Sequence, residues 1–343
     1  MPTMHPAPTT ATALANASAA PLRPVIDPTA PLLFVINAAS GRNDPATTRQ
    51  VIEAALKAAG RSGELLFARP QDLPGVARKA ASTAMQRHTA VVAVGGDGTI
   101  NAVAQAAHAQ GCAMGVLAQG TFNYFARTHG LATEPADALK ELLQSTPLPV
   151  QVGLVNERVF LVNTSLGLYP ELLEDREAYK ARFGRSRFVA FGAALVTLLG
   201  PHRLLRLRIE RGTGTRDVTT PTLFVGNNRL QFEQVGLAQA PALDQGRIAA
   251  VMLRPLGRLA MLGLILRGSM GTLGEAATVE SFKFRHMVVK PRLAWIRQRV
   301  KVAIDGEVSW MRSPLEFQTS PRPLYLMKPT LEVSKDDSGS GPA

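Results

Sequence analysis

The sequence predicts a two-part α/β plus β protein: an N-terminal doubly wound parallel α/β domain, then a C-terminal antiparallel β-sandwich-like domain with helical insertions. Strand-like and helix-like patterns alternate from residue 32 to about residue 146, which is typical of βα units around a parallel sheet. After Pro147-Leu148-Pro149 the pattern changes to short apolar runs with turns rich in Gly, Asn and Asp. The 343 residues also exceed the size at which a single core usually stops growing, about 250–300 residues.

The elements of the first half follow from apolar periodicity and from helix start and stop signals. Asp44-Pro45 is a cap followed by a first-turn proline, and Gly60 ends the helix that it begins. We expect strands at residues 32–36, 64–68, 91–94 and 115–118. We expect helices at residues 44–59, 73–86, from 100 onward, and 135–144.

The second half is expected to be mostly strands. The strand-like runs are residues 151–154, 159–162, 204–209, 223–225, 247–253, 287–289 and 300–304. Two helical stretches, about 172–199 and 256–270, interrupt them. The predicted domains are therefore residues 31–148 and 149–330, and polar or low-complexity composition predicts disordered tails at 1–30 and 331–343. The first tail has no positive n-region and no leucine-rich core, so a secretory signal is not expected.

The stretch from Val91 to Asn101 (VVAVGGDGTIN) is the most informative motif of the chain. A buried strand stops in a glycine turn and feeds a helix, which leaves backbone N–H groups free at the carboxyl edge of the sheet, where anions bind. The glycines let a ligand approach the backbone, and the carboxylate of Asp97 suits Mg²⁺ or a ribose hydroxyl. The alternative is a simple turn in which Asp97 or Thr99 caps the helix.

Charge and cysteine content narrow the function classes. A net charge of +12 points to an anionic partner, and a single cysteine excludes an internal disulfide framework and favours a reducing compartment. Basic residues concentrate at 179–211 and 281–304, and the apolar run 188–199 within the first segment is too short to span a bilayer. An apolar patch ringed by arginines suits an anionic lipid surface, although a buried helix with solvated arginines is the plainer alternative. No nucleic-acid signature is present, so no nucleic-acid partner is expected.

Three further segments follow strands and so are expected near the glycine turn or across from it. They are Asn37-Ala38-Ala39-Ser40-Gly41, Gly120-Thr121-Phe122-Asn123-Tyr124 and Asp305-Gly306-Glu307. Each alone is typical of a turn, and Asp-Gly in particular is a favoured hairpin turn. Together and in this order, they resemble the diacylglycerol kinase catalytic-domain family, whose lipid kinases share a fold with NAD kinase. The resemblance covers roughly residues 32–327.

The resemblance implies an ATP-dependent lipid kinase with its active site in the cleft between the two domains and Mg²⁺ as metal. The implied nucleotide contacts are Asn37, Ser40, Gly41, Gly95, Gly96, Asp97, Gly98, Thr99, Ile100, Asn101, Gly120, Thr121 and Asn123. Glu307 is the implied proton acceptor, with Asp305 beside it as a base, metal or orienting carboxylate. The candidate metal ligands are Asp97 and Asp244. The expected partner is a lipid, diacylglycerol or a related sphingoid or glycerolipid, at an anionic membrane surface, and the expected location is the cytoplasm with peripheral membrane association.

The sequence departs from the family pattern at three positions. Ala38 stands where the first motif usually has proline, Tyr124 where an aspartate usually follows the asparagine, and Gln245 at an aspartate of a regulatory Mg²⁺ site. Two other functions therefore remain: a soluble small-molecule kinase of the NAD kinase type, and a non-catalytic lipid-binding module on a kinase scaffold. The acceptor lipid, the preferred nucleoside triphosphate and the oligomeric state, with a homodimer as one option, are left open.

Overall fold

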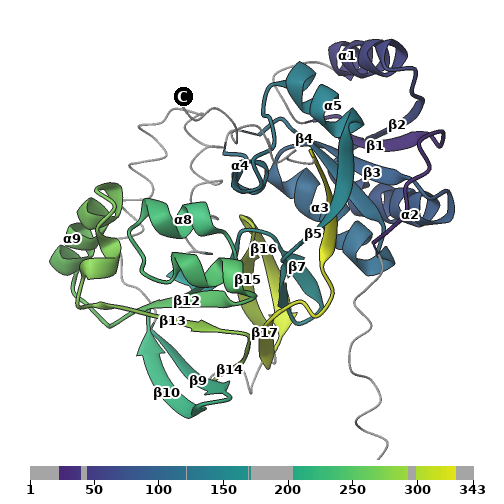
Figure 1. The fold of residues 1–343 in the computed structure, drawn as a ribbon. Helices are drawn as coiled ribbons and strands as arrows, with labels where there is room; N and C mark the ends of the chain where they lie inside the picture. Colours follow the sequence, from purple (N-terminus) through teal and green to yellow (C-terminus); the bar gives the residue numbers. More distant parts are fainter. Residues whose placement is uncertain are drawn as a thin grey trace, which may run out of the picture.

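The computed structural model describes residues 23–39, 45–120, 122–168, 170, 204–292 and 299–329. Within these ranges the chain forms three six-stranded sheets, and helices lie beside two of them (Figure 1). The expected helix at 172–199 and the predicted tail at 331–343 lie outside the described residues. None of the helices in the described ranges is long and apolar enough to cross a membrane.

The first sheet has the strand order β2-β1-β3-β4-β18-β5. Its strands are β1 (Leu32–Asn37), β2 (Gly63–Ala68), β3 (Ala90–Gly95), β4 (Ala113–Ala118), β5 (Ser145–Val150) and β18 (Leu324–Pro329). The pairs from β2 to β18 are parallel, and only β5 runs antiparallel to its neighbour. Parallel strands need coverage on both faces, which explains why β1, β3 and β4 are almost continuously apolar and buried.

Helices cover both faces of this sheet, as the doubly wound pattern predicted. They are α1 (Pro45–Ala58), α2 (Leu73–Gln86), α3 (Asp97–Gln110), α4 (Tyr124–Thr128) and α5 (Pro135–Leu143). Ile52 of α1 and Leu139 of α5 share one core with the sheet, whereas Ala77 of α2 and Val103 of α3 share the core of the opposite face. Cys112 is buried in the second of these cores, consistent with a packing role.

Two features of the first sheet differ from the expected boundaries. Residues 324–329, assigned from the sequence to the β-rich domain, form β18 between β4 and β5 of the first sheet. Residues 23–30, assigned to a disordered tail, contribute to the same part of the protein: Ile26 packs on the core of β1, Ala30 is buried, and the backbone N–H of Asp27 donates to the carbonyl of His88. The pairing of β18 with β4 and the hydrogen bond from Asp27 to His88 join residues that are far apart in the sequence, so local composition does not reveal them.

The remaining strands form two sheets in which every described neighbour pair is antiparallel. The second sheet has the order β10-β9-β14-β17-β6-β7, with β6 (Gly153–Val155), β7 (Arg158–Phe160), β9 (Leu205–Arg211), β10 (Gly214–Thr220), β14 (His286–Pro291) and β17 (Leu315–Thr319). The third has the order β13-β12-β11-β8-β15-β16, with β8 (Asn163–Gly167), β11 (Thr222–Gly226), β12 (Ile248–Leu253), β13 (Val279–Phe284), β15 (Arg299–Ile304) and β16 (Glu307–Arg312).

These two sheets pack face to face around one core, in agreement with the predicted sandwich. Leu207 and Phe317 of the second sheet meet Leu223 and Val302 of the third in that core. Two short helices, α8 (Arg229–Gln234) and η1 (Ala240–Gln245), lie on the opposite face of the third sheet, η2 (Leu273–Glu275) contacts β13, and α9 (Arg258–Ser269) contacts η2. Of these, α8 and η1 pack on β12 through a small apolar cluster that contains Phe232 and Val251.

Candidate active site

The glycine turn joins β3 directly to α3. Gly96 is the N-cap of α3, its backbone is extended, and no side chain caps the helix. The arrangement therefore differs from the alternative in which Asp97 or Thr99 caps α3, and the first N–H groups point out of the positive end of the helix. A Cβ on Gly120 would lie 2.8 Å from Oδ1 of Asn123 and 3.2 Å from Cα of Gly96, so the loops after β3 and β4 approach closely and leave little room for a side chain at position 120.

Asp97, the first residue of α3, has a carboxylate that is only partly satisfied. Its Oδ1 atom is buried and has no hydrogen-bond partner among the described residues, and the same is true of Oδ1 of Asn123. Burial raises the pKa of Asp97, and a hydrogen bond from the backbone amide of Asn123 opposes part of that rise. Two buried acceptor oxygens beside the glycine turn fit a hard cation or a hydroxyl donor.

Asn37 at the end of β1 reaches the same edge of the sheet. Its Nδ2 donates to Oγ1 of Thr99 at 3.2 Å, and its Oδ1 accepts from the backbone N–H of Ala39 at 3.0 Å. Thr99 is buried in the first turn of α3. The first and third strands are thus linked at their carboxyl ends by side chains that the sequence singled out.

Asp305 occupies the turn between β15 and β16 and points inward. Positive φ at both Asp305 (46°) and Gly306 (89°) fits a two-residue hairpin turn, which explains the Asp-Gly sequence. Oδ1 of Asp305 accepts from the backbone N–H groups of Val162 and Asn163, both at 2.9 Å. Oδ2 accepts from the N–H of Leu161 at 2.8 Å and from Nδ2 of Asn101 at 2.6 Å.

The four donors around Asp305 fit an ionised carboxylate. Burial is the largest influence and holds the pKa of Asp305 above its usual value, although the four hydrogen bonds oppose part of that rise. Each oxygen already faces two N–H donors, so a proton on either oxygen would meet a donor instead of an acceptor. Because Asn101 belongs to α3, this carboxylate also ties the β15–β16 hairpin to the helix that begins at the glycine turn.

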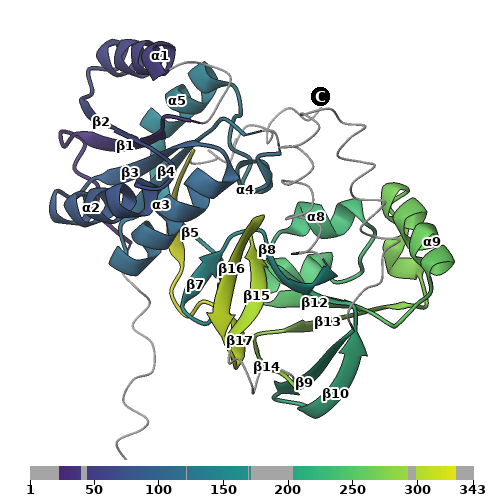
Figure 2. The same ribbon diagram turned by 180° about the vertical axis from the view of Figure 1, so that it is seen from behind.

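Glu307, two residues after Asp305, is exposed and faces the start of α3. A Cβ built on Gly98 would lie 2.6 Å from Oε1 of Glu307, so glycine at position 98 leaves the space that this carboxylate occupies. Both ribbon views show β16 near α3 (Figures 1 and 2). The structure therefore brings together Glu307 and the glycine turn, although more than 200 residues separate them in the sequence.

An apolar pocket of about 280 Å³ lies between the third sheet and α8. Phe224 and Leu253 from the sheet and Phe232 and Val235 from α8 are among its lining side chains. Gln231 also lines the pocket, and its Oε1 accepts a hydrogen bond from Nδ2 of Asn163, whose backbone N–H donates to Asp305. One short chain of hydrogen bonds therefore connects the pocket to the Asp305 turn.

Asn163 and Gln231 were not among the residues chosen from the sequence, nor was Asn228. Oδ1 of Asn228 caps α8 by accepting from the N–H of Gln231, and its Nδ2 donates to Oγ1 of Thr128 in the first half of the chain. The available signal was the Asn227-Asn228 pair directly after the apolar run of β11. Two adjacent amides after a buried strand are typical of a segment that must satisfy several backbone groups.

Four of the candidate residues are not placed at the site by the structure. Ser40, Gly41 and Thr121 lie outside the described residues, so their contacts stay predictions. Asp244 belongs to η1, which packs on β12 and α8. Within the described part of the chain, no group of three or more His, Cys, Asp or Glu residues could hold a metal ion, and a metal site at Asp244 stays a prediction.

Comparisons with known proteins found relatives that cover most of the chain. The sequence model of the diacylglycerol kinase catalytic domain matches residues 31–155. A protein of Pseudomonas aeruginosa (strain UCBPP-PA14) named "Probable lipid kinase YegS-like" is 29% identical over 291 residues, which are 81% of this chain and 89% of that protein. A protein of the same name from Pseudomonas putida is 30% identical over 264 residues, 70% of this chain and 77% of that protein.

Among solved structures, a crystal structure of a diacylglycerol kinase from Bacillus anthracis has the same fold. Its TM-score is 0.63 at 18% sequence identity, with 87% of this chain and 96% of that chain covered. Fold and sequence similarity thus extend well beyond the matched catalytic domain. The glycine turn, the Asp305 turn and Glu307 lie within a chain that belongs to the diacylglycerol kinase catalytic-domain family.

Proposed function

We propose that this protein is an ATP-dependent lipid kinase that transfers the γ-phosphate of ATP to a hydroxyl group of a lipid, in a cleft between the glycine turn and the β15–β16 hairpin. One observation carries the proposal: the Glu307 carboxylate lies against the first turn of α3, where Gly98 leaves room for it. A base beside an anion-binding helix start is what phosphoryl transfer to a hydroxyl requires.

In this proposal the glycine turn holds the phosphates of ATP. The uncapped N–H groups of α3 and its positive dipole end favour phosphate oxygens. The close approach of Gly96 and Gly120 exposes backbone from two loops to the same ligand. The other predicted nucleotide contacts are Asn37, Ser40, Gly41, Gly95, Asp97, Thr99, Ile100, Asn101, Thr121 and Asn123.

Asp97 is the proposed ligand of Mg²⁺. Its buried Oδ1 without a partner among the described residues, next to the equally unpartnered Oδ1 of Asn123, fits an oxygen-seeking cation. The raised pKa of Asp97 reflects the cost of burying its charged carboxylate, and a bound cation would offset that cost. When bound, Mg²⁺ neutralises phosphate charge during the transfer.

Glu307 accepts the proton of the attacking lipid hydroxyl, and Asp305 is a positioning residue. Glu307 is exposed and therefore accessible to a substrate. Both oxygens of Asp305 are already occupied by four hydrogen-bond donors, which leaves it no capacity to take a proton from a substrate. Of the three roles that the resemblance implied for Asp305, the orienting role is the one that its contacts favour.

The apolar pocket beside Gln231 supports a lipid as the acceptor. Its volume of about 280 Å³ lies just below the range of about 300–1,000 Å³ typical of ligand pockets, and its apolar lining suits an acyl chain. Hydrogen bonds through Asn163 connect the pocket to the Asp305 turn, which precedes the proposed proton acceptor Glu307. Diacylglycerol or a related sphingoid or glycerolipid combines such a chain with a hydroxyl.

The test is ATP consumption by the purified protein with a panel of lipids in mixed micelles, with NAD as a soluble comparison substrate. Glu307→Gln is expected to lower turnover by about 10²–10⁴-fold, the usual contribution of a general base, with ATP affinity nearly unchanged. Glu316→Gln, an exposed glutamate paired with His286, is the matched control. Unchanged turnover in Glu307→Gln would remove Glu307 from the mechanism, and NAD-dependent or absent ATP consumption would favour the alternative functions.

A further inference from the structure

The outward face of the β15–β16 hairpin carries a cluster of cations around an exposed tryptophan. Cross-strand register pairs Arg299 with Arg312, Lys301 with Trp310, and Ala303 with Val308. Side chains alternate along a strand, so these six share one face, whereas Val302, Ile304 and Met311 belong to the sandwich core. Of the six, three are cationic and none is acidic. We call Arg299, Lys301, Trp310 and Arg312 the hairpin cluster.

The charges of the hairpin cluster repel each other. Arg299 and Arg312 are exposed and directly opposite each other, an arrangement that destabilises an antiparallel pair. Neither guanidinium takes part in an ion pair with another residue of the described ranges. Nζ of Lys301 lies 5.4 Å from the ring centroid of Trp310, which fixes a third cation over the aromatic face. An external anionic surface would relieve this repulsion.

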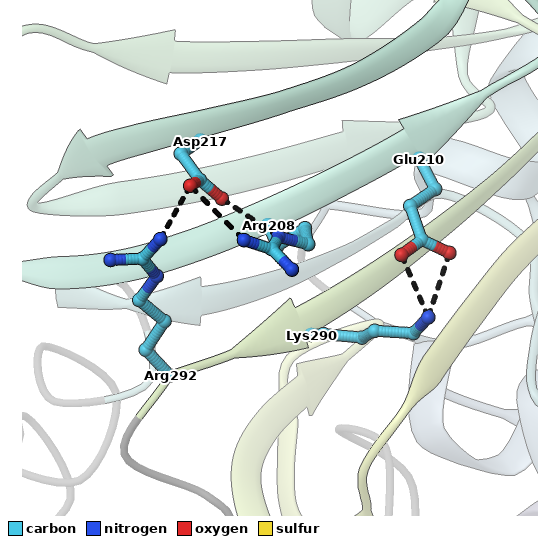
Figure 3. A network of polar contacts seen from close by, with 5 residues as sticks. All are labelled: Arg208, Glu210, Asp217, Lys290 and Arg292. Atoms are coloured by element: carbon cyan, nitrogen blue, oxygen red, sulfur yellow. Dashed lines mark hydrogen bonds and ion pairs between the residues drawn. The ribbon is translucent and has the colours of Figure 1, made fainter.

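The basic residues of the second sheet are arranged differently. In Figure 3, Asp217 lies between Arg208 and Arg292, and both oxygens of Glu210 contact Nζ of Lys290 at 2.7 and 2.8 Å. Acidic residues of β9 and β10 therefore neutralise most of the charge on that face. This network includes residues of both basic segments that the sequence singled out, whereas the excess positive charge of the third sheet is at the hairpin cluster.

Trp310 identifies the kind of surface that the hairpin cluster fits. Trp310 is 60% exposed, although it is energetically unfavourable for the large apolar ring of tryptophan to remain in water. Tryptophan concentrates at membrane–water interfaces, and arginine and lysine near an anionic leaflet are each favourable by about 1 kcal/mol. We propose that the hairpin cluster docks the protein on a bilayer that contains anionic phospholipids, with Trp310 inserted at the level of the head groups.

This docking deepens the proposed function, on which its role in catalysis rests. β16 begins at Glu307, so Trp310 lies three residues further along the same strand, about 10 Å away at the usual rise per residue. Side chains alternate along the strand and Glu307 pairs with Ile304, so Glu307 and Trp310 start from opposite faces of β16, and a bilayer at Trp310 would lie beside the hairpin that carries the proposed proton acceptor without facing that carboxylate directly.

Vesicle binding without ATP tests the proposal independently of catalysis. The chain has two tryptophans, so Trp295→Phe leaves Trp310 as the single reporter. We expect this protein to sediment with phosphatidylcholine/phosphatidylglycerol vesicles, to stay in solution with pure phosphatidylcholine, and to be released by high salt. The emission of Trp310 is expected to shift to the blue on binding and to be quenched by lipids brominated near the head group.

Two variants of the full-length protein locate the contact. Arg312→Glu is expected to weaken vesicle binding at least tenfold, and its new cross-strand pair with Arg299 should preserve the fold. Trp310→Ala is expected to weaken binding at least fivefold. The matched controls are Arg78→Glu and Met85→Ala, both exposed on α2, and each is expected to remain within twofold of the parent.

The docking proposal would be overturned if the parent protein did not bind anionic vesicles, if neither variant affected binding, or if binding left the emission of Trp310 unchanged. Loss on charge reversal alone, with Trp310→Ala unchanged, would indicate a general polyanion surface and would also overturn it. Turnover of a short-chain lipid in solution separates the two proposals. It should be unchanged in Arg312→Glu and Trp310→Ala, and its absence in the parent protein would count against the kinase instead.

Discussion

The buried carboxylate of Asp305 offers the strongest test of how the two halves of the molecule are joined. Asp305→Asn keeps the size of the side chain and removes one acceptor oxygen. If the remaining oxygen still accepts from Val162 and Asn163, the new amide group faces the N–H of Leu161 and Nδ2 of Asn101. The N–H of Leu161 and Nδ2 of Asn101 would then both face the amide NH₂ group of the new side chain, which is itself a donor and cannot accept their hydrogen bonds.

The expected destabilisation follows from these contacts. Asn101 can rotate its amide to restore one hydrogen bond, but this gives up its contact with the carbonyl of Val159 at 3.1 Å. The backbone N–H of Leu161 cannot rotate, and an unsatisfied buried donor costs about 1–3 kcal/mol. With loss of charge-assisted bonds to the other donors, we expect the free energy of unfolding to fall by about 3 kcal/mol.

Urea unfolding followed by far-UV circular dichroism measures this change, with the midpoint and slope compared between variants. The matched control is Asp217→Asn, whose ion pairs with Arg208 and Arg292 are solvent-exposed and screened, so a much smaller change is expected. If Asp305→Asn is as stable as the parent at neutral pH, the carboxyl group is protonated in the folded protein. The argument that four donors select an ionised group would then fail.

Two other substitutions test the glycine turn. Asp97→Asn is expected to abolish kinase turnover yet stabilise the fold at neutral pH, because the folded-state pKa of Asp97 is raised and ionisation therefore opposes folding. The stability advantage over the parent, measured by urea unfolding, should grow as pH rises through the unfolded and then the folded pKa; an advantage that shrinks would contradict this sign. Gly98→Ala is expected to gain up to about 1 kcal/mol in helix stability but to lower kcat by displacing Glu307. Normal kcat in this variant would show that the position of Glu307 is not critical.

Much of the first sheet could be predicted because its signals are local. The helix expected at 73–86 is α2 with the same bounds, and the apolar runs before each glycine or polar turn are β1 to β4. In the second half, β8, β10, β13, β16, β17 and β18 were missed. β10 (GTRDVTT) has little apolar periodicity, and the exposed side chains of β16 break the alternation expected of a half-buried strand. Pairing with β9 and β15 makes them strands, and such pairing is not visible in a single segment.

The candidate site was accessible from the sequence to the extent that its residues follow strands. The carboxyl ends of β1, β3 and β4 meet at one edge, so Asn37, Thr99 and Gly120 could be grouped in advance. The partners of Asp305 could not be found in this way. Three consecutive N–H groups at residues 161–163 converge on it only because the crossover from β7 to β8 bends around the carboxylate. Every residue except proline has a backbone N–H, so the amino-acid sequence does not show which of these groups will donate to a given carboxylate.

The turn at Asp305 satisfies two demands with one residue. Positive φ at the first position of the hairpin restricts the choice to Gly, Asn or Asp, and the four converging donors select the carboxylate among these. The donor Asn101 lies one helical turn after Asp97 in α3, so the helix that presents its N–H groups to phosphate also fixes the hairpin. The separation between the glycine turn and Glu307 is therefore set in part by the Asp305 carboxylate, together with the hydrogen bonds of Asn101 and Gln105 in α3 to Val159.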